Sequence, residues 1–360
     1  MDTIESLRRQ AREIGLFLPL AEGDAQTAAL QQTAALHGRT LKNRAALLMQ
    51  PVWDADENGA PTAETVARYC NAVRQRAYGI IWTEPIAVLP DARADAHQLM
   101  LTEENKDAFQ AMLQDVAQAA EEAHGFSPVP VALLGHAGSY ALRPVTVEPH
   151  PYLPKRFTVL TDDDLTRLVV SCGEAAARAE QAGFAGVALN ACNSELFGES
   201  LAAFHRDGRF GGDFDDRTRF LRDCYTAMYM TLEQAFLTIR LSLSDGIPQP
   251  DGWGMGCEDP SAPDLDEPAL LLEILRQLFG VELVSCTVGI DGLNWMNADE
   301  EEQEIIRISR LCTCIAMADS DLQQNVQLIL PEKTGQTVPF ESLAAGMIGG
   351  EFASFAGYAG

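Results

Sequence analysis

Five polar residues that could do chemistry stand close together near the middle of the chain: Asn190, Cys192, Asn193, Ser194 and Glu195. They follow a short apolar run that ends at Leu189. A buried strand that releases polar side chains at its carboxyl end is how a parallel α/β barrel builds an active site. Amide side chains can donate hydrogen bonds to an oxyanion. A carboxyl group can act as an acid near neutral pH if desolvation raises its pKa, and otherwise Glu195 is an ordinary surface acid.

Arg240 is a second candidate, because it lies inside the apolar stretch Phe236–Leu243. A guanidinium stays protonated in a protein and must find an acceptor. Two explanations are open at this point. Arg240 forms a salt bridge with an acid on a neighbouring strand, such as Glu84, or it contacts an anionic or polar ring at the mouth of a barrel.

The elements that must position these residues alternate between short apolar runs and longer segments with helical periodicity, which is typical of repeated βα units. Candidate strands are Ala45–Met49, Gly79–Glu84, Val129–Leu134, Gly186–Leu189, Leu237–Leu243, Val281–Cys286, Val326–Leu330 and Phe352–Phe355. Candidate helices are Ala63–Arg76, Glu104–Ala123, Asp162–Gln181, Arg217–Glu233, Glu267–Phe279, Glu300–Ala318 and Pro339–Ala345. The pattern predicts an α/β fold, a (β/α)8 TIM barrel. A doubly wound sheet is the alternative, but no GxGxxG follows the first strand.

The end of the chain is unusual for such a barrel. The eighth predicted strand is followed only by Ala356–Gly360, so the barrel is expected to end at strand eight without the usual final helix. A truncated chain, a helix donated from elsewhere, or an apolar flank covered by a partner would each explain this. The last explanation includes a homo-oligomer.

The composition of the chain limits the classes of partner that it can bind. The chain has 360 residues, 26 basic and 52 acidic, and a formal net charge of −26. Such a surface repels nucleic-acid phosphates and offers no basic patch to an anionic membrane. No apolar run is long enough for a membrane span, and the first residues lack the features of a signal peptide. The eight cysteines form no CxxC, which favours buried thiols in the cytoplasm and predicts no metal site.

Several motifs together resemble the old yellow enzyme family of flavin oxidoreductases, in its bacterial branch, over about residues 35–290. They are Leu41–Arg44 with Gln50-Pro51, Gly79–Glu84, Gln98–Asn105, His136–Gly138, the Ala191-Cys192 pair, Arg206–Gly212 with Arg217–Phe220, Asp245–Pro248 and Gly252–Gly254. The arginines and glycines of the Arg206–Phe220 region are expected to hold a loop by binding backbone carbonyls or acids.

The resemblance implies an FMN-dependent oxidoreductase that uses NADH or NADPH and passes a hydride from the flavin to a small activated alkene. Residues 41–360 would be the FMN-type barrel domain, and residues 1–40 an extension packing on it. The positions expected to bind the cofactor are Gln50, Pro51, Val52, Pro85, Leu133, Arg240 and Lys333. The positions expected to be catalytic are Asn190, Asn193 and Glu195.

The same comparison of motifs shows departures from the family. Asn190 and Asn193 stand where the family holds the substrate oxygen, and Glu195 stands where a Tyr donates the proton. Leu133 replaces a cofactor-binding Gln. The phosphate loop reads Pro331–Gly335, with Lys333 as its only cation, and an Arg expected near Gly357 is missing.

Two functional hypotheses follow. The first is an ene-reductase-like enzyme with an altered proton-donor site, and Arg240 and Gln50-Pro51 favour it. The second is a catalytically impaired or non-catalytic barrel that serves in binding or assembly, and Leu133, Asn190 and Glu195 favour that. Binding of FMN separates the two.

Overall fold

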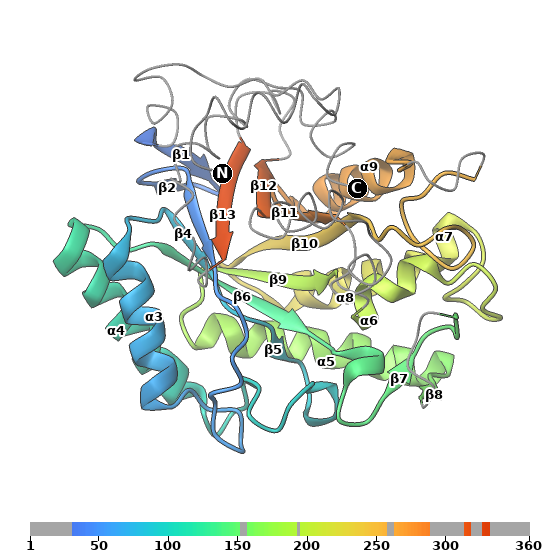
Figure 1. Ribbon diagram of the computed structural model, residues 1–360, viewed down its shortest axis with the longest axis horizontal. Coiled ribbons are helices and arrows are strands. Elements are labelled where there is room, and N and C mark those ends of the chain that lie inside the picture. Colours follow the sequence, from blue (N-terminus) through green and yellow to red (C-terminus); the bar gives the residue numbers. More distant parts are fainter. Residues whose placement is uncertain are drawn as a thin grey trace, which may run out of the picture.

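A closed ring of eight strands forms the centre of the computed structural model, which describes residues 31–151, 157–192, 195–257, 263–288, 313–317 and 326–331 (Figure 1). The ring strands, in order, are β3 (Ala45–Leu48), β4 (Ile80–Trp82), β6 (Val129–Gly135), β9 (Gly186–Ala191), β10 (Phe236–Ser244), β11 (Leu283–Val288), β12 (Thr313–Met317) and β13 (Val326–Pro331). Neighbours pair in parallel from β13 through β3 to β11. Only β12 runs antiparallel to both of its neighbours.

The prediction of an α/β barrel is thus confirmed in outline, but the ring closes through β13, which was predicted as the seventh strand and not the eighth, and β12 breaks the all-parallel pattern. Residues 300–318 were expected to form a helix, but Thr313–Met317 form strand β12. A short apolar run cannot be assigned to strand or helix from periodicity alone, and neighbouring strands decide it. The predicted strand at 352–355, the predicted helix at 339–345 and the end of the chain lie outside the described residues.

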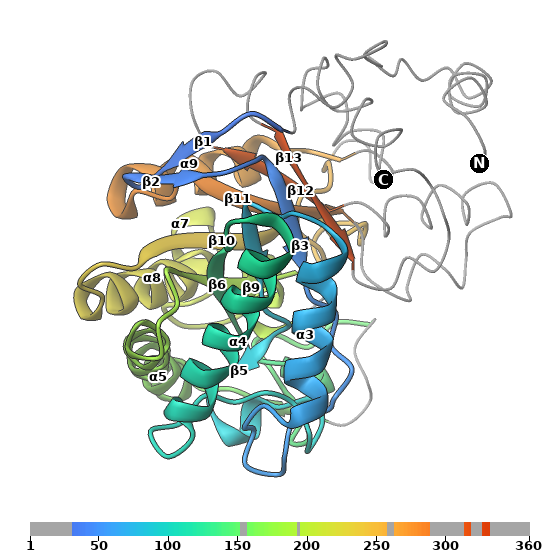
Figure 2. The same ribbon diagram turned by 90° about the vertical axis from the view of Figure 1, so that its left-hand side faces the viewer.

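Helices cover the outside of the ring (Figures 1 and 2). The long ones are α3 (Ala63–Gln75), α4 (Lys106–His124), α5 (Asp162–Gln181), α8 (Arg219–Thr231) and α9 (Asp266–Phe279), close to the predicted ranges. Shorter elements are β1 (Ala34–Leu36), β2 (Arg39–Leu41), β5 (Ile86–Ala87), β7 (Val145–Thr146), β8 (Thr158–Val159), α6 (Leu196–Glu199), α7 (Phe214–Arg217) and the 3-10 turns at Pro90–Ala92, Gly138–Tyr140 and Ser200–Ala202. None of the helices in the described ranges is both long and apolar enough to cross a bilayer.

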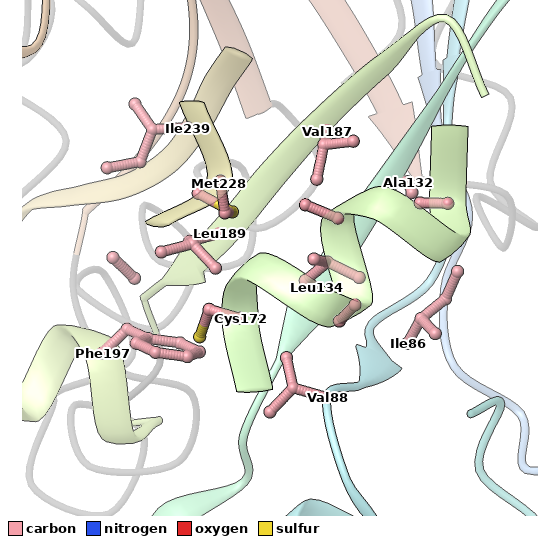
Figure 3. Packing of buried hydrophobic residues seen from close by; sticks show 14 of the residues in the cluster. Ile86, Val88, Ala132, Leu134, Cys172, Val187, Leu189, Phe197, Met228 and Ile239 are labelled. Atoms are coloured by element: carbon pink, nitrogen blue, oxygen red, sulfur yellow. The ribbon is translucent and has the colours of Figure 1, made fainter. Parts of the chain in front are cut away.

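Side chains of the ring strands β3, β4, β6, β9, β10 and β11 alternate between two apolar cores, as the pleat requires. One set, which includes Leu134, Val187 and Ile239, packs outward beneath the helices (Figure 3). The other set fills the inside of the barrel and includes Trp82, Leu133 and Ala188. These two cores leave only the ends of the barrel for polar groups.

The amino-terminal end of the barrel is closed by the hairpin of β1 and β2. Leu36 and Leu41 are fully buried in the inner core, and His37 stacks on Phe236 with ring centroids 5.1 Å apart. Because Phe236 is the first residue of β10, the hairpin covers the end where the strands begin. The opposite, carboxyl end therefore remains for a site.

Candidate active site

Three polar side chains lie side by side at the carboxyl end of the barrel. Asn190 on β9 is the register partner of Arg240 on β10, and Arg240 is the partner of Ser285 on β11. Register partners on neighbouring strands point to the same face of a sheet. Asn190 lies two residues after Ala188, whose side chain belongs to the inner core. The row Asn190–Arg240–Ser285 therefore faces the barrel interior just above that core.

Glu195 reaches the same place from the loop after β9. It precedes the first residue of α6, and its N–H donates to the Cys192 carbonyl at 3.0 Å. The next N–H, that of Leu196, donates to the His136 carbonyl at 3.0 Å. Two backbone hydrogen bonds thus fix the point from which the Glu195 side chain starts.

Gly135, the last residue of β6, provides the space for the Glu195 carboxyl group. A Cβ placed on Gly135 would lie 3.1 Å from Glu195 Oε2 and 3.2 Å from Pro85 Cβ. Contacts this short force the neighbours to shift. The carboxyl group therefore packs directly over the glycine at the barrel mouth.

Burial raises the pKa of Glu195 to about 7, although a hydrogen bond from Asn190 and the positive charge of Arg240 both favour the ionised form. The residue as a whole is half-buried, but desolvation of its carboxyl group is the largest influence on this pKa. Glu195 is therefore not an ordinary surface acid. It can hold a proton near neutral pH and release it to a group above the barrel mouth.

Arg240 does not form the salt bridge with Glu84 that one of the two explanations required. Glu84, the acid offered as its partner, instead forms an ion pair with Arg68. Within the described ranges Arg240 makes no ion pair, and its Nε is buried without a hydrogen-bond partner. Two hydroxyl oxygens on β11, Ser285 Oγ and Thr287 Oγ1, are also buried without a hydrogen-bond partner.

These unpartnered atoms test whether the site suits the flavin that the resemblance implies. A buried polar atom without a partner costs free energy, so a cluster of them fits a ligand that supplies the missing partners. Arg240 and Ser285 offer donors to the oxygen- and nitrogen-rich edge of such a ring. The residues at this end of the barrel therefore fit FMN at its polar edge.

The other predicted cofactor-binding positions differ in what they offer. Gln50 and Val52 are half-buried and Pro51 is exposed, all in the loop after β3, while Pro85 is buried after β4. Leu133 is fully buried in the inner core, so it offers a ligand no polar side-chain group. Asn193 and Lys333 lie outside the described residues, and their roles stay predictions.

The arginine-rich loop has the structural role that its sequence indicated. Arg206 donates to the Val147 carbonyl at 2.6 Å and pairs with Asp162 at 2.9 Å. Arg217 is 1% exposed, donates to the Leu201 carbonyl at 2.8 Å and pairs with Glu267. Both side chains hold loop segments to the barrel and leave the site to other residues.

Glu199, one turn after Glu195, anchors the short helix that carries the acid. Its carboxyl group accepts hydrogen bonds from the Val147 N–H at 2.7 Å and from the Thr146 hydroxyl. Burial raises the pKa of Glu199 to about 7. The helix is therefore tied at both ends, through His136 at its start and Thr146 near its end.

Gly135 and Ser285 were not among the residues that the sequence singled out. Gly135 directly precedes His136, so its place at the end of a predicted strand was a signal that could have been read. The importance of Ser285 depends on strand register, and a single sequence does not give it. His136, expected to be packed rather than catalytic, is buried and accepts a hydrogen bond at Nδ1 from the Gly138 N–H at 3.0 Å.

Comparison with known proteins places the chain among flavin oxidoreductases. The profile of the NADH:flavin oxidoreductase / NADH oxidase family matches residues 35–253. An NADPH dehydrogenase of Bacillus pumilus is 28% identical over 222 residues, covering 58% of this chain and 62% of the relative. A probable flavin mononucleotide-dependent alkene reductase of Leishmania infantum is 26% identical over 230 residues, covering 57% of this chain and 61% of the relative. The chain thus spans about three fifths of the length of these curated relatives.

Solved structures agree on the fold. An old yellow enzyme homologue from Zymomonas mobilis has a TM-score of 0.55 at 21% identity, covering 73% of this chain and 76% of the other. A 2-naphthoyl-CoA reductase in complex with 2-naphthoyl-CoA has a TM-score of 0.63 at 16% identity, covering 73% of this chain and 41% of the other. At these identities the likeness shows a shared barrel fold.

Proposed function

The chain belongs to the NADH:flavin oxidoreductase / NADH oxidase family, and from that premise we propose that it is an FMN-dependent NAD(P)H oxidoreductase of the ene-reductase type with a carboxylic acid as proton donor. The observation that carries the proposal is the position of Glu195. Its carboxyl group packs over Gly135 beside Asn190, within the field of Arg240. An acid whose pKa lies near 7 is suited to proton transfer at neutral pH.

Each residue of the site has a separate task in this proposal. FMN, when bound, supplies the hydride that it has received from NADH or NADPH. Arg240 and Ser285 hold the polar edge of the cofactor, with the backbone around Gln50, Pro51, Val52 and Pro85 as further support. Asn190, together with Asn193 in the predicted scheme, donates a hydrogen bond to the carbonyl or nitro oxygen of the substrate.

Glu195 then completes the reduction of the alkene. One carbon of the double bond accepts the hydride, and the other takes the proton from the Glu195 carboxyl group. Arg240 lies close enough for its charge to favour the ionised carboxylate that remains after the transfer. The proposal requires that solvent then returns the proton to the Glu195 carboxylate.

Purified protein tests the proposal in two steps. We expect a yellow preparation that carries about one FMN per chain, or that takes up FMN when it is added. Anaerobic mixing of the NAD(P)H-reduced protein with an activated alkene such as cyclohexenone should reoxidise the flavin. A preparation that stays colourless with excess FMN, or a reduced flavin that the alkene leaves unchanged, would contradict the proposal.

A second candidate function is a barrel that binds or assembles without catalysis. The observation that favours it is Leu133, which presents an apolar side chain where the family has a cofactor-binding Gln. The weakened phosphate loop around Lys333 is part of the same hypothesis. Failure to bind FMN would favour this second function over the first.

The partners follow from the reaction. We expect a small-molecule substrate and neither nucleic acid nor a membrane as partner, and a homo-oligomer stays a prediction. Six cysteines whose side chains the structure describes are free thiols, and five of these six are buried, which agrees with the proposed cytoplasmic location.

A further inference from the structure

Cys192 makes contacts on both sides of the proposed proton donor. Its thiol donates a hydrogen bond to Asn190 Oδ1, with the sulfur and oxygen 3.0 Å apart. Its carbonyl accepts the hydrogen bond from the Glu195 N–H at 3.0 Å. The Asn190 and Glu195 side chains lie together over Gly135, where a Cβ would be 3.8 Å from Asn190 Cβ and 3.1 Å from Glu195 Oε2, and the hydrogen bond that Asn190 gives the carboxyl group favours its ionised form. The three residues therefore form a closed loop of hydrogen bonds.

We propose that Cys192 is a positioning residue for the acid, because its thiol fixes the orientation of the Asn190 amide and thereby the hydrogen bond that Asn190 gives to Glu195. The inference deepens the proposed function and rests on it where the rate of alkene reduction is concerned. Cys192 itself touches neither substrate nor cofactor in this scheme. It acts through Asn190.

The amide orientation follows from what each neighbour can do. When Glu195 is ionised, its carboxylate only accepts hydrogen bonds, so Asn190 must turn its N–H2 group toward it; the protonated acid keeps one acceptor oxygen for the same donor. The amide oxygen then faces Cys192, where the thiol is the donor it needs. A flipped amide would place its oxygen against the carboxylate and its N–H2 group against sulfur, which is a weak acceptor. The thiol therefore favours the productive orientation.

The surroundings leave this arrangement little freedom. Cys192 and Asn190 are each 1% exposed. Helix α6 packs so tightly on the end of β9 that a Cβ on Gly198 would lie 3.0 Å from the Ala191 carbonyl carbon and 3.2 Å from the Cys192 nitrogen. A small cavity also borders Cys192, so the site is not sealed against water. Loss of the thiol still removes the one donor that the described residues give to the Asn190 amide oxygen.

The charged groups around Glu195 determine the direction of the expected change. Arg240 from β10 is the cation that favours the ionised form. His136, directly after β6, stays neutral, because burial lowers its pKa to about 4. Gly135 and Pro85 carry no charge. Once Asn190 no longer donates to it, the carboxylate loses one of two stabilising groups, so the pKa of Glu195 should rise further.

Two variants and one control test the inference in the full-length protein. Cys192→Ala removes the donor, whereas Cys192→Ser keeps a hydroxyl donor at the same position. Cys70→Ala is the control, because it removes a buried thiol from helix α3. The pKa of Glu195 is read from the 13C carboxyl resonance of glutamate-labelled protein, which Glu195→Gln assigns. Thermal unfolding confirms that each variant is folded before the titration.

We expect Cys192→Ala to raise the pKa of Glu195, and Cys192→Ser and Cys70→Ala to leave it at the wild-type value. In the FMN-loaded protein, the rate of flavin reoxidation by cyclohexenone at pH 6 should fall about five- to tenfold in Cys192→Ala, the size of one hydrogen bond. Cys192→Ser should recover most of that rate. An unchanged pKa in Cys192→Ala, or a Ser variant that behaves as the Ala variant does, would overturn the inference.

The carboxyl titration needs neither flavin nor turnover. A protein that fails to reduce the alkene but shows the shift in Cys192→Ala would contradict the proposed function and support the role of Cys192. A protein that reduces the alkene without any shift would support the proposed function and contradict the role of Cys192. The two failures are therefore distinguishable.

Discussion

Arg217 and Arg240 show two different uses of a guanidinium inside the same barrel protein. Arg217 is 1% exposed, binds the Leu201 carbonyl and Glu267, and stacks over the ring of Phe204 at 4.1 Å. Arg240 sits within a barrel strand with its Nε buried and unpartnered, beside two hydroxyls of β11 in the same state. A single unpartnered atom does not mark a ligand site, because Arg206 Nε is also buried without a partner although Arg206 holds a loop. At Arg240 three such atoms cluster on two adjacent strands, and a cluster of this kind fits a ligand that supplies the missing partners.

The comparison extends to the carboxyl groups. Asp162 accepts from Arg206 and from the Arg209 N–H, and these partners outweigh its desolvation, so its pKa is lowered. Glu195 has one neutral donor and the charge of Arg240 against its burial, and its pKa is raised to about 7. A raised pKa alone does not mark a reacting acid, since the pKa of Glu199, which anchors α6, is also about 7; Glu195 differs because its carboxyl group lies at the barrel mouth over Gly135.

The largest effect is expected when the Glu195 carboxyl group is replaced by an amide of the same shape. In FMN-loaded protein, Glu195→Gln should lower the rate of alkene reduction by about 10²- to 10⁴-fold, the usual contribution of a positioned acid. The rate at which NAD(P)H reduces the flavin should stay near the wild-type value. Stopped-flow measurement of the two half-reactions checks this, and an alkene rate within twofold of wild type would remove Glu195 from the mechanism.

The pH dependence of alkene reduction tests the role of Glu195 without a mutation. Because the acid must be protonated to act and its pKa is about 7, alkene reduction should be constant at low pH and fall about tenfold per pH unit above that value. In Glu195→Gln the rate should no longer fall above this pH. If the fall persists in Glu195→Gln, another group is responsible for the titration.

Arg217→Met should destabilise the fold without affecting the candidate site. It leaves the Leu201 carbonyl without its donor and Glu267 without its cation, so the free energy of unfolding should fall by about 1–3 kcal/mol. Affinity for FMN at a temperature where the variant is folded should not change. Urea unfolding and flavin titration measure the two quantities, and a loss of affinity with unchanged stability would reverse the assignment.

The smallest expected effect concerns the space above Gly135. A Cβ there would lie 3.1 Å from Glu195 Oε2, the far end of a flexible side chain, which can move a few tenths of an ångström. Gly135→Ala should therefore change thermal stability little and slow alkene reduction a few-fold, since misplacement of a reacting group by about 1 Å can cost 10²-fold. A variant with wild-type alkene kinetics would show that the carboxyl group does not act from this position.

Much of the barrel could be predicted because its strands are apolar runs between helices with clear periodicity. The run before Asn190 and the run that contains Arg240 were both assigned correctly. The segment at Thr313–Met317 was not, because a short apolar run adopts the conformation that its neighbours allow.

The site was harder to predict than the strands. The sequence identified Asn190, Glu195 and Arg240 as residue types suited to chemistry, but left open whether Glu195 lay at the surface and whether Arg240 paired with Glu84. Both answers depend on distances between residues far apart in the chain: Glu195 over Gly135, and Glu84 with Arg68. Register and packing, which a single sequence does not contain, decided both.

The central claim, that the unsatisfied donor of Arg240 marks a flavin site, is tested most directly by titrating FMN into wild-type protein and Arg240→Met side by side. Calorimetry or flavin fluorescence gives both dissociation constants. The claim predicts binding at about one FMN per wild-type chain and an affinity about 10- to 100-fold weaker in Arg240→Met, the loss expected for a charge-assisted hydrogen bond. Equal affinities for the two proteins, or no binding to the wild type, would contradict it.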